Sequence, residues 1–292
     1  MWTARDHWFS YNNSCLSLRE LRPTGFNDDG DSSYSILFVH GRLGHGEIWS
    51  SIVENLAHQY RCFLLDLPGY GRSFSVGRHS PSLMEYANLL VAVVEKFSEK
   101  EKVILVGHDV GGGLAQLSTV KVPSRVAALV LVNSACISRR LGKIKIGIQG
   151  LWVRQMLKKM LKNVPKEKTE MLLHPWCNRL HRQSLAQSLK ALSETWPWHY
   201  EQKVWRESLK HLSQPVLLLW GENDSINPPE IGMELMQGLP EAYFFLNKSC
   251  GHLSCLEEPD WILSKMKDFL FKVSFNSKQP AKPTPFQKSL LR

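Results

Sequence analysis

An aspartate stands where a sequence of this pattern would place a nucleophile. The apolar run 103–106 leads directly into Gly107-His108-Asp109-Val110-Gly111, and a helical pattern follows. A strand, a sharp turn and a helix with small residues two before and two after the central side chain form a nucleophile elbow, because a Cβ at those positions would clash in the turn. Asp109 therefore occupies a position that serine usually holds.

The same glycine-rich turn has a second interpretation, as a cradle for a phosphate group. Phosphate loops follow the patterns G-x-x-x-x-G-K-[ST] or G-x-G-x-x-G. The segment 107–113 fits neither pattern. The nucleophile elbow is therefore the favoured interpretation.

An acid and a histidine follow two later strand-like runs. Asp224 comes just after the run 216–220, and His252 comes after the run 242–246. Functional side chains in sheets of this kind gather at the carboxyl ends of the strands. We therefore expect Asp109, Asp224 and His252 to lie close together as nucleophile, orienting acid and base.

The residue type at the elbow restricts the substrate. A carboxylate that attacked an ester would form an anhydride, whereas attack on the sp³ carbon of an epoxide or a halide forms an ordinary alkyl ester. His252, oriented by Asp224, would then act as general base toward the water that hydrolyses this ester. Two other interpretations remain open. In the first, the chain is an esterase or a carbon–carbon-bond hydrolase in which Asp109 is not the nucleophile. In the second, the chain binds a ligand without turnover.

Strand and helix patterns alternate over most of the chain. Helices are predicted over 81–97, with Ser80 as N-cap and Pro81 in the first turn, and over 259–272. The runs that predict strands are 15–21, 34–39, 60–65, 103–106, 127–132, 216–220 and 242–246. Several are apolar throughout, as in a parallel sheet that is buried on both faces. The alternation predicts an α/β fold with a mostly parallel central sheet flanked by helices.

The alternation stops between residues 137 and 212, where the pattern becomes helical, basic and rich in tryptophan. We therefore expect a core domain formed by 1–136 and 213–273, and a helical insertion over 137–212. The tail 274–292 is rich in Pro, Lys and Ser and is predicted to be disordered. Residues 139–212 carry 16 Lys and Arg against 5 Asp and Glu. The basic charge is thus local, and no nucleic-acid-binding motif accompanies it.

Composition excludes several classes of protein. With 292 residues, 43% hydrophobic and 22% charged, the chain has the composition of an ordinary globular protein. The longest apolar run, 126–132, is far shorter than the ~18 residues of a membrane span, and no secretion signal is recognised. A cytoplasmic location is expected. The scattered cysteines predict reduced thiols, and neither a metal nor a cofactor is predicted.

The chain resembles an enzyme of the α/β-hydrolase fold, in the branch of epoxide hydrolases and haloalkane dehalogenases. The matching landmarks are His40-Gly41-Arg42 with Trp49, the segment 66–73, the elbow at 107–109, the segment 220–224, and Gly251-His252 followed by Glu258-Pro259. The resemblance implies that the insertion 137–212 is a cap domain over the site. It also implies that the backbone N–H groups of Arg42 and Val110 form the oxyanion hole.

Leaving-group chemistry separates the members of this branch. Haloalkane dehalogenases have a Trp after the nucleophile, where this chain has Val110, and haloacetate dehalogenases have arginines that 110–113 lacks. Epoxide hydrolases supply proton donors from the cap, and here the candidates are Tyr200 and His199. The resemblance therefore implies an epoxide hydrolase first and a dehalogenase second.

The expected partner is a lipophilic small-molecule substrate, and the sequence does not determine the oligomeric state. The segment 147–162 has a basic amphipathic pattern. Such a helix either lies on an anionic membrane surface or buries its apolar face over the active site, and the second interpretation is favoured. The basic charge of the insertion leaves an anionic substrate or an acidic lipid open.

Overall fold

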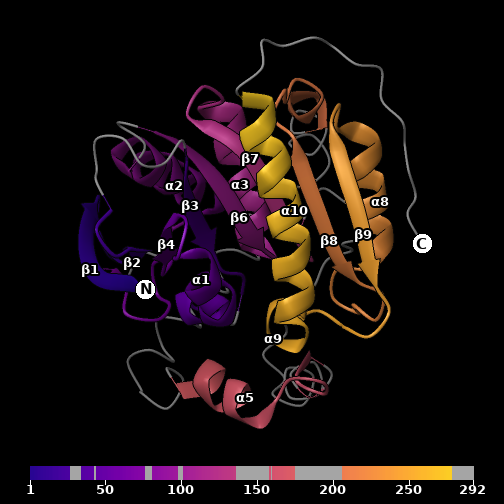
Figure 1. Ribbon diagram of the computed structural model, residues 1–292, viewed down its shortest axis with the longest axis horizontal. Coiled ribbons are helices and arrows are strands. Elements are labelled where there is room, and N and C mark those ends of the chain that lie inside the picture. The colour runs from indigo at the N-terminus through magenta and orange to yellow at the C-terminus, as the bar shows by residue number, and fades with distance from the viewer. Residues whose placement is uncertain are drawn as a thin grey trace.

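A nine-stranded sheet lies at the centre of the molecule (Figure 1). The computed structural model describes residues 1–26, 34–42, 44–75, 81–97, 101–135, 158, 160–174 and 206–277. The strands are β1 (Trp2–Tyr11), β2 (Ser14–Pro23), β3 (Tyr34–Val39), β4 (Arg61–Leu65), β5 (Phe74–Ser75), β6 (Lys102–His108), β7 (Val126–Val132), β8 (Val216–Gly221) and β9 (Ala242–Asn247).

Most of the sheet is parallel. Its order is β1-β2-β4-β3-β6-β7-β8-β9, and β5 pairs with β2 outside this path. Every pairing from β4 across to β9 is parallel, whereas β2 pairs antiparallel with β1, β4 and β5. In the centre, Val39 of β3 pairs with Gly107 of β6. The carboxyl ends of the parallel strands therefore lie along one edge, as the predicted α/β fold requires.

Helices cover both faces of this sheet. They are η1 (Gly46–Trp49), α1 (Ser50–Leu56), α2 (Leu83–Phe97), α3 (Val110–Lys121), α5 (Lys166–Leu173), α8 (Pro229–Gly238), α9 (Ser254–Glu257) and α10 (Pro259–Ser277). Buried side chains of α2, α3 and α8 belong to one core cluster, and those of α1, α9 and α10 belong to another. In Figure 1, α10 crosses in front of the sheet and α3 lies behind it.

The alternating side chains of each central strand contribute to both clusters. In β3, Leu37 and Val39 pack on the side of α2 and α3, whereas Ile36 and Phe38 pack on the side of α1 and α10. All four are almost completely buried. This two-sided burial explains the continuous apolar sequence, and each such side chain contributes about 1.5–3 kcal/mol on transfer from water.

Two strands were not predicted from the sequence. β1 is an edge strand in which most side chains are exposed, including Trp8 at 56%. Its sequence therefore lacks an apolar run, and it is held by a ten-residue antiparallel ladder with β2. β5 has only two residues, Phe74 and Ser75. Neither strand has the local pattern that identifies the central ones.

The predicted helix bounds need two corrections. α2 begins at Leu83, and a capping box formed by Ser82 and Glu85 precedes it. The Glu85 N–H donates to Ser82 Oγ at 3.3 Å and the Ser82 N–H donates to Glu85 Oε2 at 2.7 Å. Ser80 was therefore the wrong N-cap. α10 continues to Ser277, so residues 274–277, which were predicted to be the start of the disordered tail, are helical.

Most of the predicted insertion lies outside the described residues. Within 137–212 the structure describes α5, which lies against η1 of the core. Tyr200, His199, most of the segment 147–162 and residues 278–292 are not described. The expectations about the cap domain, its proton donors and the tail therefore stay predictions.

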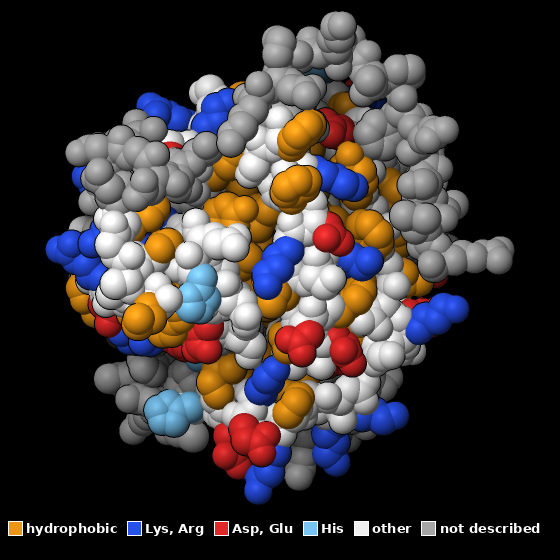
Figure 2. Space-filling model, in the orientation of Figure 1, with side chains coloured by type: hydrophobic (Ala, Val, Ile, Leu, Met, Phe, Trp, Pro, Cys, Tyr) orange, Lys and Arg blue, Asp and Glu red, His pale blue; other side chains and the backbone are white. Residues whose placement is uncertain are grey.

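The face of the molecule that carries α10 has side chains of mixed type. On the face that carries α10, acidic and basic side chains are interspersed with hydrophobic ones (Figure 2). Among the described residues, no helix has the length and hydropathy needed to cross a bilayer.

Candidate active site

Asp109 lies at the sharp turn between β6 and α3, as the elbow pattern predicts. Its backbone has φ +49° and ψ −122°, a conformation that non-glycine residues rarely adopt. A Cβ on Gly107 would come within 2.5 Å of Gly112 Cα, and a Cβ on Gly111 would overlap the carbonyl oxygens of Val39 and His40. The turn is therefore possible only with glycine at these two positions.

Backbone hydrogen bonds hold the elbow in this conformation. The Asp109 N–H donates to the Val132 carbonyl oxygen at 3.3 Å, and the Ala135 N–H donates to the Asp109 carbonyl oxygen at 2.8 Å. A backbone conformation of this kind costs about 1–3 kcal/mol of folding free energy and persists only where the surrounding structure enforces it. Such strain is typical of residues whose side chains must project into a site.

His252 and Asp224 form a buried pair at the same edge of the sheet. Asp224 follows β8 and His252 follows β9, and His252 Nδ1 lies 2.9 Å and 3.1 Å from the two carboxylate oxygens. Because an ionised carboxylate only accepts hydrogen bonds, Nδ1 carries the proton and Nε2 is left to accept one. Burial lowers the pKa of His252, but the Asp224 carboxylate outweighs this effect and raises it above the ordinary value.

Asp224 is itself held by donors from two loops. Its Oδ1 accepts the backbone N–H groups of Ile226 at 2.8 Å and Asn227 at 2.9 Å. Its Oδ2 accepts Asn133 Nδ2 at 2.7 Å. These bonds fix the carboxylate, and the carboxylate in turn fixes the imidazole of His252.

The carboxylate of Asp109 is completely satisfied. Its Oδ2 accepts the Arg42 backbone N–H at 3.1 Å and Arg42 Nε at 2.8 Å. Its Oδ1 accepts Arg42 Nη2 at 2.8 Å and Asn227 Nδ2 at 3.0 Å. The side chain of Asp109 is only 1% exposed, whereas that of Arg42 is 21% exposed. Arg42 therefore covers Asp109 on the more accessible side.

The electrostatics of the site favour a charged Asp109 beside neutral His40 and His108. Burial raises the pKa of Asp109, but the Arg42 guanidinium holds it well below the ordinary value. Burial lowers the pKa of His40 to about 3 and that of His108 to about 4. His252 also lowers the pKa of Asp109, so the two side chains influence each other's ionisation.

Three residues that support the site were not predicted. Asn133, at φ +44° just after β7, donates to Asp224 and accepts a short hydrogen bond from Ser254 Oγ. Asn227 donates to Asp109, as described above. Glu257 accepts the N–H groups on both sides of His252, from Gly251 and Leu253. The only sequence signal is that Asn133 is the first polar residue after an apolar run.

The structure thus brings Arg42, Asp109, Asp224 and His252 to one edge of the sheet. Val110 lies there too, as the first residue of α3, where helix N–H groups have no carbonyl partner within the helix. Tyr200 and His199 are not described. In the described part of the chain, no cluster of three or more His, Cys, Asp or Glu is arranged to hold a metal ion.

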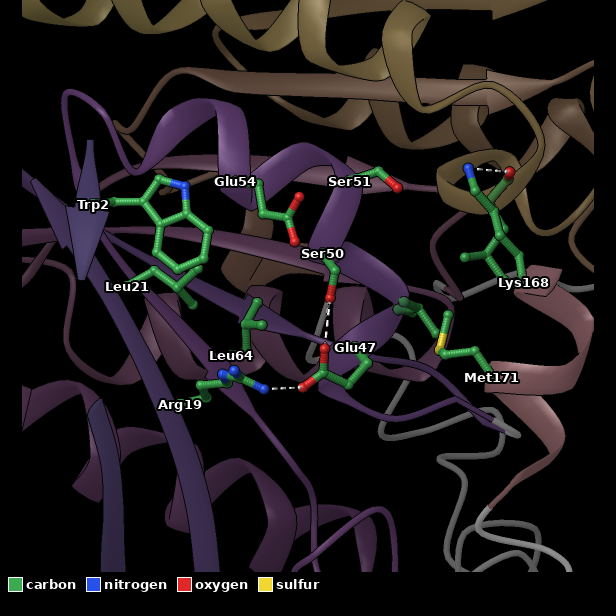
Figure 3. A pocket seen from close by; sticks show the side chains of 12 residues that line it. Trp2, Arg19, Leu21, Glu47, Ser50, Ser51, Glu54, Leu64, Lys168 and Met171 are labelled. Atoms are coloured by element: carbon green, nitrogen blue, oxygen red, sulfur yellow. Dashed lines mark hydrogen bonds and ion pairs between the residues drawn. The ribbon is translucent and has the colours of Figure 1, made fainter. Parts of the chain in front are cut away.

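A separate cavity of about 330 Å³ lies between β2, α1 and α5 (Figure 3). None of the predicted site residues lines it. Two of its cationic side chains are already engaged, because Arg19 Nη1 bonds Glu47 Oε1 at 3.1 Å and Lys168 Nζ bonds the Leu256 carbonyl oxygen at 3.1 Å. This cavity is therefore distinct from the site around Asp109.

Comparisons with known proteins agree with this fold. The family model of the alpha/beta hydrolase fold matches residues 34–156 and 152–259. A 2-hydroxy-6-oxononadienedioate/2-hydroxy-6-oxononatrienedioate hydrolase of Paraburkholderia phymatum is 28% identical over 273 residues, which cover 86% of this chain and 91% of that protein. An uncharacterized hydrolase of Bacillus subtilis, YugF, is 27% identical over 252 residues, 81% of this chain and 89% of that protein.

The crystal structure of haloalkane dehalogenase DbeA from Bradyrhizobium elkani superimposes with a TM-score of 0.74 and 18% identity. The match covers 94% of this chain and 100% of that one. At this identity the structural likeness supports the fold alone.

Proposed function

Because the chain belongs to the alpha/beta hydrolase fold family, we propose that it is a hydrolase that acts through an ester on Asp109, with epoxide ring opening as its reaction. The observation that carries this proposal is the strained elbow. It holds a carboxylate beside the His252–Asp224 pair, with the Arg42 backbone N–H 3.1 Å from Oδ2. A carboxylate in that place suits attack on sp³ carbon.

In the first step, an oxygen of Asp109 attacks an epoxide carbon and the carbon–oxygen bond of the ring breaks. The electron pair goes to the epoxide oxygen, which must take up a proton. Tyr200 and His199 are the proposed donors for this proton. Since Arg42 occupies both oxygens of Asp109, one of its hydrogen bonds must open before the attack.

In the second step, His252 Nε2 takes a proton from water, and the oxygen of that water attacks the carbonyl carbon of the ester. The backbone N–H groups of Arg42 and Val110 are the proposed donors to the tetrahedral oxyanion. When this intermediate collapses, the leaving alkoxide takes the proton back from His252 and departs as the diol, and the carboxylic acid that remains releases its proton, which restores the carboxylate of Asp109 and replaces the proton given to the epoxide oxygen. One oxygen from water then remains on Asp109.

A second candidate function follows from the four donors on the Asp109 carboxylate. The low pKa that Arg42 imposes makes this carboxylate a weak base and a weak nucleophile. In this alternative, Asp109 only positions Arg42, and His252 activates water toward a carbonyl, as in an ester or carbon–carbon-bond hydrolase. The relative from P. phymatum carries the name of a hydrolase that acts on 2-hydroxy-6-oxononadienedioate.

The experiment that separates these candidates is a single turnover of an epoxide in ¹⁸O-labelled water. With the wild-type protein, we expect the label in the peptide that contains Asp109, as measured by mass spectrometry. With His252→Gln, we expect the alkyl ester on Asp109 to accumulate, because the base for its hydrolysis is missing. The matched control is His211→Gln, which replaces an exposed histidine. This variant should hydrolyse the ester at the wild-type rate.

Turnover without label or adduct on Asp109 would contradict the aspartyl-ester mechanism and favour the second candidate. Accumulation of adduct in the His211→Gln control would contradict the role of His252.

A further inference from the structure

Arg42 uses only one side of its guanidinium on Asp109. A guanidinium has N–H groups on Nε, Nη1 and Nη2. Nε and Nη2 each donate to one oxygen of Asp109. Nη1 has no hydrogen bond to any residue in the part of the chain that the structure describes, and the side chain is 21% exposed. The second side of this cation is therefore open to another anion.

The proposed reaction removes the anion that Arg42 now holds. When Asp109 forms an ester, its side chain becomes neutral. The nearest histidines do not replace the lost charge, because a histidine is neutral or positive, and His40 and His108 have lowered pKa values. Arg42, a group that is always ionised, would then be a largely buried cation that has lost its directly bonded counterion and keeps only the longer-range attraction of Asp224, which is unfavourable.

An anion on the substrate would supply a counterion for Arg42 and would compete with Asp109 for its guanidinium. We propose that Arg42 Nη1 binds a carboxylate that the substrate carries next to its reacting carbon, so that the substrate class is 2,3-epoxy carboxylates. This inference rests on the proposed aspartyl-ester function. A carboxylate adjacent to the attacked carbon lies within reach of the guanidinium that holds the nucleophile. A second carboxylate on Nη1 shares the positive charge of Arg42 and so weakens its two side-chain hydrogen bonds to Asp109, which makes one oxygen easier to free for attack.

The substrate carboxylate also remains after the ester has formed. It is not consumed in the reaction and serves as the counterion of Arg42 until the ester is hydrolysed. Arginine suits this role because its planar fork binds two carboxylates through different N–H groups. The net positive charge of residues 139–212 would favour the approach of such an anion.

The test compares glycidate, an epoxy carboxylate, with glycidamide, its neutral isostere. For the wild-type protein, we expect kcat/KM to be at least about tenfold higher for glycidate, the lower range for a charge-assisted hydrogen bond. In Arg42→Gln this ratio should fall to about one. In Arg72→Gln, which removes an arginine that is 44% exposed and pairs with Asp6, the ratio should stay that of the wild type.

A binding measurement that needs no turnover accompanies the kinetics. Glycerate, the diol product of glycidate, should bind the wild-type protein at least about tenfold more tightly than glyceramide in titration calorimetry. This comparison holds even if Arg42→Gln fails to fold. Equal preference for the acid and the amide in both measurements would overturn the inference, as would a preference that Arg42→Gln retains.

The outcomes also separate this inference from the function on which it rests. If glycerate binds selectively but no ester forms on Asp109 in His252→Gln, the anion site stands and the aspartyl-ester function fails. If the ester forms equally well from glycidamide, the function stands and the anion site fails.

Discussion

At the scale of single residues, one amide joins the two carboxylates of the site. Asn227 donates its backbone N–H to Asp224 at 2.9 Å and its side-chain Nδ2 to Asp109 at 3.0 Å. The same Nδ2 lies 2.8 Å from the Asn133 carbonyl oxygen. Asn227 is completely buried, so water does not compete for these groups. It therefore fixes the position of Asp109 relative to Asp224.

Replacing Asn227 by alanine should destabilise the protein by about 1–3 kcal/mol, because Asp109 and the Asn133 carbonyl oxygen each lose a buried donor. The measurement is urea unfolding monitored by circular dichroism. Asn223→Ala is the matched control, since its Nδ2 bonds the Lys248 carbonyl oxygen at an exposed position and its loss should cost little. Equal losses in the two variants would contradict this account of Asn227.

The stability of the protein should depend on the protonation of Asp109. Its pKa in the folded state lies well below the ordinary value of about 3.9 for aspartate. The folded state therefore binds this proton less readily than the unfolded chain. Asp109 contributes stability above about pH 4, and this contribution is lost progressively as the pH falls below that value.

We expect the unfolding free energy of the wild type to fall with decreasing pH by up to about 1.4 kcal/mol per pH unit more than that of Asp109→Asn, which has no carboxyl group there. Urea titrations between about pH 4 and pH 2 give this comparison. Parallel pH profiles for the two proteins would show that Asp109 does not carry a lowered pKa.

The residues of the site differ in how far the sequence predicted them. Asp109, Asp224 and His252 stand in recognisable motifs after strands. The sequence analysis assigned only the backbone N–H of Arg42 to the site. The direction of its side chain toward Asp109 depends on packing between distant segments, and no local pattern encodes that packing. Asn227 was missed for the same reason, because its partners lie far away in sequence.

At the scale of elements, the elbow between β6 and α3 has no space for a side chain at Gly111. Gly111→Ala should destabilise the protein by at least about 1–3 kcal/mol, because the new Cβ would overlap backbone oxygens of β3 and the residue after it, His40. Gly238→Ala is the matched control, since a Cβ at that end of α8 meets no atom within 4 Å. Thermal unfolding of both variants measures the difference, and equal melting temperatures would contradict a tightly packed elbow.

The sequence predicted elements well where burial determines their composition. The seven predicted strands all exist, with bounds that differ by at most two residues at either end. The central strands β3, β6, β7 and β8 are apolar because helices cover both faces of the sheet. β1 was missed because pairing with β2, rather than burial of its side chains, holds it in place. The N-terminus of α2 was misplaced because two serines, Ser80 and Ser82, precede it and only the second forms the capping box.

At the scale of the whole molecule, β1 protects one edge of the sheet. Removing residues 1–11 would expose the backbone donors and acceptors of β2 that now pair with β1. An exposed edge of this length pairs readily with another chain. We therefore expect the truncated protein to associate more strongly than the full chain as its concentration rises, as measured by analytical ultracentrifugation.

The substitution Trp8→Ser is the control for this truncation. It removes a side chain of β1 that is 56% exposed and keeps the ladder, so association should not increase. Increased association of the Trp8→Ser variant, or unchanged association of the truncated protein, would contradict a protective role for the backbone of β1.

The groups around Asp109 come from the ends of five neighbouring strands, β3, β6, β7, β8 and β9. No two of these strands can separate without displacing a hydrogen bond of the site. Loss of catalysis on heating should therefore coincide with cooperative melting of the sheet and should not precede it as a local event. In a variant whose core is stabilised, the temperature at which activity is lost should rise by as much as the melting temperature.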